Sequence, residues 1–214
     1  MRNADWEKYQ ELVEKYDPSI INVCPKSADE LYGFYRAYTR VLLDCVFEEI
    51  QTLPYVLANE IRAMIGHLSE HNTKIDLGNY ELQKAYGHFR RLNLDAMKIL
   101  CDELDKGFSD FISKSYKYPY YKVEEGFMAS YAKCYFEARQ LFLKAQFSEG
   151  VGSNYKANVY ETYFKAVKKY IELQKYYLDN LSEIKKIRRR TIIKRTVALA
   201  WSVANIAVSL VLIF

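Results

Sequence analysis

The sequence predicts an all-α protein, a helical bundle whose long last helix leads into one C-terminal transmembrane helix. Only 8 Gly and 4 Pro occur in 214 residues, too few for a protein of short strands that turns about every 8–12 residues. Apolar residues recur at spacings of three and four along most of the chain, which is typical of helices with one buried face. Residues 196–214 carry no charge at all.

Two helices are expected in the first 50 residues. Residues 4–16 form a short opening helix that ends before Asp17 and Pro18. Ser27 and Glu30 then match a capping box, which predicts the start of a long helix. Its apolar stripe consists of Leu31, Phe34, Tyr35, Tyr38, Leu42, Cys45, Val46 and Ile50.

Two more helices are expected between residues 54 and 113. Pro54 suits the first position of a helix that continues to residue 71. Its core face consists of Leu57, Ile61, Met64, Ile65 and Leu68. After a turn at 76–79, a helix over about residues 80–113 has a core stripe of Leu82, Tyr86, Phe89, Leu92, Ala96, Ile99 and Leu100.

Two long helices complete the expected bundle. The connector 115–122 precedes a helix over 123–147, which ends in a loop. Asn154 is the expected N-cap of the last helix, which we predict to run unbroken from Tyr155 into the membrane. The stripe of this helix consists of Tyr160, Phe164, Val167, Ile171, Leu178, Leu181 and Ile184.

The net charge of +4 hides an uneven distribution. Residues 185–195 hold seven Lys and Arg and no acid. Without those seven, residues 1–184 keep 24 of the 31 basic residues against 27 acidic ones, a net charge of −3. This is not the charge distribution of a globally basic nucleic-acid binder. We divide the chain into a helical body (1–184), a basic juxtamembrane segment (185–195) and a transmembrane helix (196–214).

The C-terminal segment has the length of a membrane span. Eighteen residues at about 1.5 Å each reach about 27 Å, close to the hydrocarbon thickness of a thin bilayer. A buried core helix is the alternative, but such a helix rarely lacks every charge. The positive-inside rule places the body in the cytoplasm, as a single-pass protein of the cell inner membrane. Contact with anionic lipid head groups is expected for Lys185, Lys186, Arg188, Arg189, Arg190, Lys194 and Arg195.

Small and polar residues recur along one side of this predicted span. They are Ala198, Ser202, Asn205 and Ser209, at spacings of four, three and four. A polar side chain at mid-membrane is unfavourable against lipid and usually faces protein or water. The pattern favours a homo-oligomer packed along this seam, and a monomeric span that tolerates Ser and Asn is the alternative.

Cysteines and histidines give no indication of a cofactor. The four cysteines are widely separated and lie in or beside apolar helical patterns, which fits reduced core residues in a reducing compartment. His67 and His71 have the spacing of two metal ligands on one helix, but no third ligand stands nearby. We predict neither a metal nor another cofactor.

Arg62 and His67 are the candidate reactive pair of the helix over 55–71. On a helical wheel they fall on opposite shoulders of the core stripe, about 140° apart. Their side chains therefore do not meet on a straight helix, unless Gly66 loosens it. A surface arginine paired with Glu60 or Glu70 and a boundary histidine are the structural alternative.

The segment ANEIRAMIGHLSEH (58–71), followed by KAYGHFRRLNLDAMKILCDEL (84–104), resembles the HEPN superfamily over about residues 27–113. Members of that superfamily are small helical bundles, and the best known are metal-independent endoribonucleases of toxin–antitoxin, CRISPR and other antiphage systems. Their hallmark is R-x4-6-H on one helix, often after an acidic residue, as Glu60 stands here. One position departs from the pattern, because Ala63 stands where active members commonly have a polar residue.

The resemblance implies roles for five residues. His67 would be the general acid/base at the ribose 2′-hydroxyl or the leaving 5′-oxygen, and Arg62 would hold the scissile phosphate. Two protomers would pair so that their motifs converge. His88, Arg90 and Arg91 would extend an RNA-binding surface, with a solvated basic face as the alternative.

Three functions fit these features. The first is a membrane-tethered, HEPN-like protein of bacterial antiphage defence that cleaves or binds RNA at the cytoplasmic face. The second is a non-enzymatic oligomeric effector that forms a pore or disrupts the membrane, similar to small membrane accessory proteins of Cas13b-type CRISPR systems that partner an RNA-guided effector. The third is a tail-anchored adaptor.

Overall fold

The computed structural model describes residues 6–73, 78–150 and 157–213. The side chains of residues 72–73, 78, 150, 157 and 206–213 lie outside the described part, as do the predicted N-cap Asn154 and the Ser209 side chain. Throughout the described residues the chain is helical, with no strand. The predicted all-α class is confirmed.

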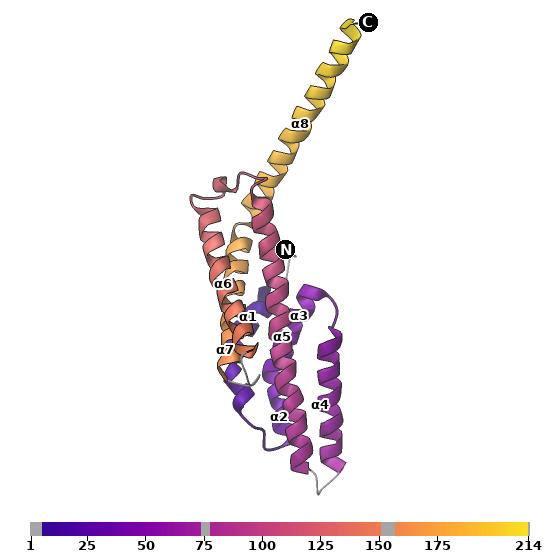
Figure 1. Ribbon diagram of the computed structural model, residues 1–214, viewed down its shortest axis with the longest axis vertical. Coiled ribbons are helices and arrows are strands. Elements are labelled where there is room, and N and C mark those ends of the chain that lie inside the picture. The colour runs from indigo at the N-terminus through magenta and orange to yellow at the C-terminus, as the bar shows by residue number, and fades with distance from the viewer. Residues whose placement is uncertain (1–5, 74–77, 151–156, 214) are drawn as a thin grey trace.

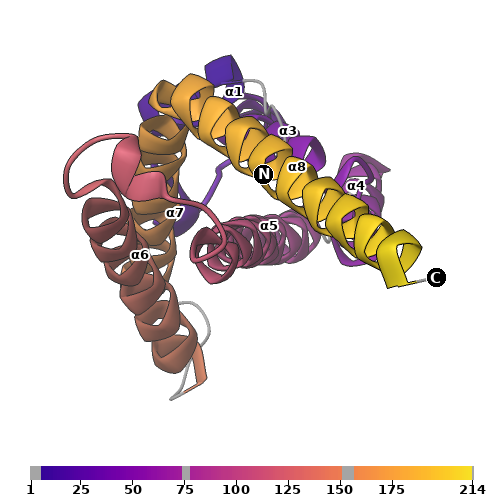
Figure 2. The same ribbon diagram turned by 90° about the horizontal axis from the view of Figure 1, so that it is seen from above.

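The longest helix of the bundle is α5 (Gly78–Ser115), which extends over roughly 57 Å at the usual helical rise. The helices α4 (Tyr55–Thr73), α3 (Arg40–Ile50) and α7 (Ala157–Asp179) pack around it, and α6 (Phe127–Gly150) packs on α7. Figure 2 shows α4 and α6 at opposite edges of the bundle. The end of α4 and the start of α5 lie at the end of the bundle opposite to the one from which α8 projects (Figure 1).

The N-terminal part wraps one side of α5 and α7. It consists of α1 (Trp6–Lys15), the short helix η1 (Pro18–Asn22), α2 (Ala28–Phe34) and a π-helical segment, η2 (Tyr35–Thr39), that continues into α3. The Ser27 Oγ accepts a hydrogen bond from the Glu30 amide at 3.1 Å, as the predicted capping box requires. The Glu30 carboxylate accepts from the Lys26 amide instead of the Ser27 amide. The capping box is therefore present, but its second hydrogen bond comes from the amide one residue before Ser27.

One predicted core residue of α4 is exposed. Leu57 and Met64 are buried, whereas Ile65 is 56% exposed. The reason is that α4 is an outer helix packed mainly against α5, and its side toward α2 is open. Ile65 lines a small apolar groove there together with Tyr32 of α2. The prediction of Ile65 as a core residue is wrong for this reason.

Much of the core is aromatic. Five tyrosines and three phenylalanines are the largest fully buried side chains: Tyr9, Tyr131, Tyr160, Tyr163, Tyr170, Phe89, Phe108 and Phe127. Buried tyrosines keep a hydrogen-bond partner for the hydroxyl, as the Tyr170 hydroxyl does by donating to Asp105 at 2.7 Å. Cys45 and Cys101 are also buried, and Cys24, between η1 and α2, is exposed.

The last helix is interrupted, contrary to the prediction of an unbroken helix from Tyr155. Helix α7 ends at Asp179, and α8 (Leu181–Ile213) begins after Asn180. The Asn180 side-chain amide donates to the Tyr176 carbonyl at 3.0 Å, so a side chain occupies the end of α7. Beyond the bundle α8 projects as a single helix (Figure 1). Within the described residues, no helix combines the length and apolarity that crossing a membrane requires.

Candidate functional site

Two histidines meet at the contact between α4 and α5. The rings of His67 on α4 and His88 on α5 are stacked, with centroids 5.2 Å apart and planes inclined by 18°. Their side chains are 25% and 19% exposed, so both rings border solvent. They lie toward the end of the bundle that is away from α8, because α5 begins at that end (Figure 1). The R-x4-H spacing predicts a role for His67 alone, and the structure brings His88 against it.

Glu81 holds the His67 ring. The His67 Nδ1 lies 2.6 Å from Glu81 Oε2, and Lys84 Nζ donates to Glu81 Oε1 at 3.2 Å. Both carboxylate oxygens are therefore engaged, and the Glu81 residue is buried. The hydrogen bond with His67 and the one from Lys84 lower the pKa of the Glu81 carboxyl, against the opposing effect of desolvation. The raised pKa of Lys84 has the same origin, chiefly its hydrogen bond to Glu81.

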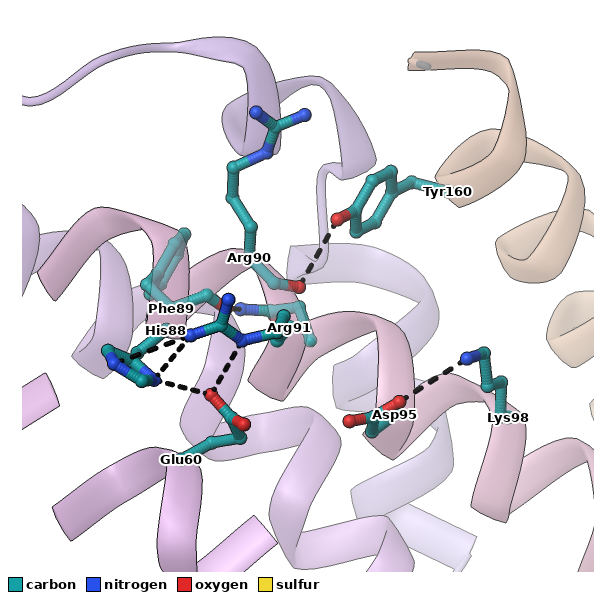
Figure 3. Close-up of polar contacts among 9 residues, drawn as sticks. Glu60, His88, Phe89, Arg90, Arg91, Asp95, Lys98 and Tyr160 are labelled. Carbon is teal, nitrogen blue, oxygen red and sulfur yellow. Dashed lines mark hydrogen bonds and ion pairs between the residues drawn. The ribbon is translucent and has the colours of Figure 1, made fainter. Parts of the chain in front are cut away.

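Glu60 and Arg91 hold the second ring, as Figure 3 shows. The Glu60 Oε2 lies 2.7 Å from His88 Nδ1 and accepts from Arg91 Nε at 3.1 Å. The Arg91 Nη2 lies 2.7 Å from the same His88 Nδ1. A guanidinium only donates, so the Glu60 and Nη2 contacts cannot both be hydrogen bonds of one neutral tautomer. We place the proton on His88 Nδ1, which donates it to Glu60, because the carboxylate then accepts from two donors. Arg91 Nη2 can then donate to the unprotonated His88 Nε2, 3.3 Å away.

The helical period explains which residues converge. Seven residues separate Glu60 from His67 and also Glu81 from His88, so each pair lies on one side of its helix, two turns apart. Because α4 and α5 run antiparallel, Glu60 faces His88 and His67 faces Glu81. Arg90 falls about 100° from Arg91 and points away from His88 (Figure 3). Its guanidinium lies 5.7 Å from the Tyr86 ring centre, and its carbonyl accepts from the Tyr160 hydroxyl.

Arg62 does not join this cluster. Helix α4 continues through Gly66 without interruption, so Arg62 stays on the far side of α4 from His67, as the wheel predicts. Its side chain is exposed and makes no hydrogen bond or ion pair with any residue that the structure describes. Within one chain the R-x4-H residues therefore do not form one site. The partners of His67 are Glu81 and His88, a pairing that the R-x4-H spacing does not predict.

No metal centre accompanies the histidine pair in the part of the chain that the structure describes. Nowhere among residues 6–73, 78–150 and 157–213 do three or more His, Cys, Asp or Glu side chains lie where they could hold a metal ion. His71, the possible second ligand of His67, lies one turn further along α4.

Two carboxylate–imidazole pairs side by side have a definite chemical capacity. A carboxylate on Nδ1 fixes the tautomer and the orientation of the ring and assigns proton uptake or release to Nε2. The His88 Nε2 also lies 3.3 Å from Arg91 Nη2. Two such rings within about 5 Å can act on two oxygens of one phosphodiester, one as base and one as acid. Arg91 and Lys84 supply positive charge beside them, with side chains 41% and 39% exposed. This histidine pair is the candidate site.

The lowered pKa of Glu81 predicts how stability depends on pH. The ionised Glu81 is stabilised in the folded state. Its contribution to the free energy of unfolding is therefore fully present above the pKa of the carboxyl in the unfolded chain, about 4.3. The contribution is lost as the pH falls through the lower folded pKa. We therefore expect Glu81→Gln to reduce the free energy of unfolding at pH 7. The variant should also lose less of this free energy than the wild type between pH 5 and 3. Denaturant titrations at several pH values measure both, and an unchanged acid slope would contradict the assignment.

Comparison with models of known protein families, with curated proteins and with solved structures finds no match.

Proposed function

We propose that this chain is a membrane-anchored, HEPN-like protein of bacterial antiphage defence that cleaves RNA without a metal at the cytoplasmic membrane face. The observation that carries the proposal is the pair of stacked histidines, each with a carboxylate on Nδ1. The R-x4-H resemblance suggested a phosphodiester substrate. The histidine pair supplies the two proton-transfer groups that such a reaction uses.

In the proposed step, one imidazole of the histidine pair accepts a proton and the other donates one. One imidazole accepts the proton of a ribose 2′-hydroxyl, and the 2′-oxygen attacks the adjacent phosphorus. The bond from phosphorus to the 5′-oxygen breaks, and the other imidazole, in its protonated form, donates a proton to that oxygen. The products are a 2′,3′-cyclic phosphate and a 5′-hydroxyl. Arg91 is the nearest guanidinium to these rings and would offset the charge that develops on the phosphate.

The experiment that tests this function is an RNA cleavage assay of the purified full chain in mild detergent. A 5′-labelled single-stranded RNA is incubated with the protein in excess EDTA, and the product ends are identified by mass spectrometry. We expect cyclic phosphate ends, whereas the 2′-deoxy substrate stays intact. Cleavage of the deoxy substrate, or intact RNA under all conditions, would exclude the mechanism.

The membrane anchor is the second part of the proposal. Three features support it: the basic segment 185–195, the uncharged residues 196–214 and the projection of α8 away from the bundle (Figure 1). The side chains of residues 206–214 lie outside the described part of the structure. We expect the chain to remain in the membrane fraction after alkaline carbonate extraction. Protease added to intact spheroplasts should leave the body undigested, and digestion from outside would contradict the cytoplasmic orientation.

A non-enzymatic, oligomeric membrane effector is a second candidate function, and the surface of α8 favours it. Ala198, Ser202 and Asn205 are exposed and share one side of this helix. The Ser202 hydroxyl donates to the Ala198 carbonyl at 2.9 Å, which satisfies it within the helix. Such a small, polar side lets helices approach closely in a membrane. Dye release from liposomes that contain the protein, unaffected by the loss of either histidine, would favour this function over RNA cleavage.

The seam on α8 predicts the effect of two substitutions on assembly. Asn205→Leu should lower the oligomeric mass in mild detergent, because an interhelical amide contact in a membrane contributes roughly 0.6–2 kcal/mol. Val203→Leu, on the opposite side of α8, is the control and should leave the mass unchanged. Mass photometry measures both. If the wild type is a monomer at micromolar concentration, the oligomer is contradicted, and so is a site that two protomers share.

A further inference from the structure

A groove of about 740 Å³ lies where α8 leaves the bundle, on the side away from the histidine pair. One wall is the connector between α5 and α6, which includes the short helix η4 (Tyr120–Lys122). The other wall is the first half of α8. The Arg195 guanidinium joins the two walls by donating to the Lys117 carbonyl at 2.7 Å. Segments almost 80 residues apart in the sequence thus form one concave surface.

The groove is strongly basic. Five basic residues line it: Lys117, Lys122, Arg190, Lys194 and Arg195. The one acid in the lining is Glu183, which is paired with Lys186 at 3.0 Å. Four of the five basic residues form no ion pair with any other residue that the structure describes: Lys117, Lys122, Arg190 and Lys194. Their charge is therefore available to an anionic ligand.

Exposed tyrosines stand among these cations. Tyr116 and Tyr121 are 80% and 69% exposed, and the ammonium groups of Lys117 and Lys122 lie 5.6 and 5.8 Å from the centres of their rings. The Arg188 guanidinium lies 5.4 Å from the Tyr118 ring centre. Tyrosine beside Lys and Arg is typical of the boundary between a membrane and water, where an amphipathic ring meets lipid head groups.

The position of the groove also selects the ligand. It lies directly before residue 196, where the uncharged part of α8 begins, at the end of the bundle from which α8 projects (Figure 1). Figure 2 views the molecule from this end, with α8 in front of the bundle. If residues 196–214 enter a bilayer, the groove stands at the depth of the phosphate groups. This step rests on the proposed anchor.

We infer that this groove is a binding site for the head group of an anionic phospholipid. Arg190 and Lys194 on α8 and Lys117 and Lys122 on the connector would contact its phosphate from opposite walls. The exposed tyrosines would lie between the glycerol backbones of neighbouring lipids. Binding would hold the connector against α8, and so fix the bundle relative to the membrane surface.

The test is native mass spectrometry of the full chain in mild detergent with equal amounts of phosphatidylglycerol and phosphatidylcholine. We expect preferential retention of phosphatidylglycerol. Lys122→Gln/Lys194→Gln, one change in each wall, should weaken that retention about tenfold or more. The matched control is Lys144→Gln/Lys165→Gln, which removes the same charge from exposed positions of α6 and α7. It should retain the lipid as the wild type does.

Three outcomes would overturn the inference. They are equal retention of the two lipids, equal losses in the groove and control variants, and displacement of the lipid by millimolar inorganic phosphate or a short RNA. The last outcome would assign the groove to a soluble anion or to nucleic acid. Because lipid retention is measured in detergent, failure of the anchor appears separately, as release of the wild type by carbonate extraction. Failure of RNA cleavage leaves this measurement unaffected.

Discussion

Replacement of either His67 or His88 by alanine should lower the rate of RNA cleavage by about 10²- to 10⁴-fold, the range typical of a lost general acid or base. Each ring contributes one of the two proton transfers, and the other ring cannot perform both at once. Both side chains are partly exposed, so truncation should leave the fold intact. Single-turnover cleavage of a labelled RNA measures the rate, and the melting temperature reports the fold.

The third histidine provides the control for this prediction. His71 lies on the same helix and is no member of the stacked pair, so His71→Ala should keep full activity. Full activity in folded His67→Ala and His88→Ala variants would mean that the two glutamate–histidine pairs serve only to join α4 to α5. Loss of folding in both variants would support the same structural role.

Mixing experiments distinguish a site within one chain from a site shared by two. If Arg62 of one protomer completes the site of its partner, inactive Arg62→Ala and His67→Ala chains should restore about a quarter of the activity when mixed. Random pairing makes half of the dimers heterodimers, and each heterodimer has one intact site and one inactive site. A His67→Ala and His88→Ala mixture should restore none, because these rings stack within one chain. Restoration by the second mixture would contradict the observed pairing.

The fold was largely predictable because the buried faces repeat with the helical period. Leu31, Leu42 and Val46 on the first long helix, and Leu82, Phe89 and Leu92 on α5, are all buried as their spacing predicts. Periodicity reports which side of a helix is apolar, but it does not report how much of that side a neighbour covers. Ile65 is exposed for that reason, since the side of α4 that faces α2 is open.

The break between α7 and α8 has a different origin. The apolar stripe continues from Val167 to Ile184 with helical spacing, and no Pro or Gly interrupts it. Asn180 ends α7 through its side-chain bond to the Tyr176 carbonyl. Asparagine competes for backbone partners in this way without any change in the apolar pattern, so the pattern alone did not indicate the break.

The candidate site was only half predictable. His67 was identified with Arg62 through the R-x4-H spacing, which joins residues on opposite sides of one helix. The informative signal was the seven-residue spacing of Glu60 with His67 and of Glu81 with His88, on two helices joined by a short turn. An antiparallel pair with these repeats places each glutamate opposite the histidine of the other helix. The register of α4 against α5 was needed to recognise this.

The largest effect on stability is expected at Asn93, the only fully buried asparagine among the described side chains. Its Oδ1 accepts from the Tyr16 hydroxyl and from the Thr39 Oγ1, both at 3.1 Å, and its Nδ2 donates to the Phe89 carbonyl at 2.8 Å. One amide thus joins the end of α1 and the π-helical segment η2 to α5. Burial also raises the pKa of the Tyr16 hydroxyl, which stays a hydrogen-bond donor at every physiological pH.

Asn93→Leu should therefore lower the free energy of unfolding by about 2–6 kcal/mol, because it leaves two buried hydroxyls without an acceptor at about 1–3 kcal/mol each. Thr39→Val alone should cost about 1 kcal/mol, since Asn93 keeps its bond with Tyr16. In the Asn93→Leu background the same Thr39→Val change should be neutral or stabilising, because it removes one of the unpaired hydroxyls. Denaturant unfolding of the four proteins in mild detergent measures this cycle. Additive losses would mean that the two side chains act independently, and the network would then not join η2 to α5.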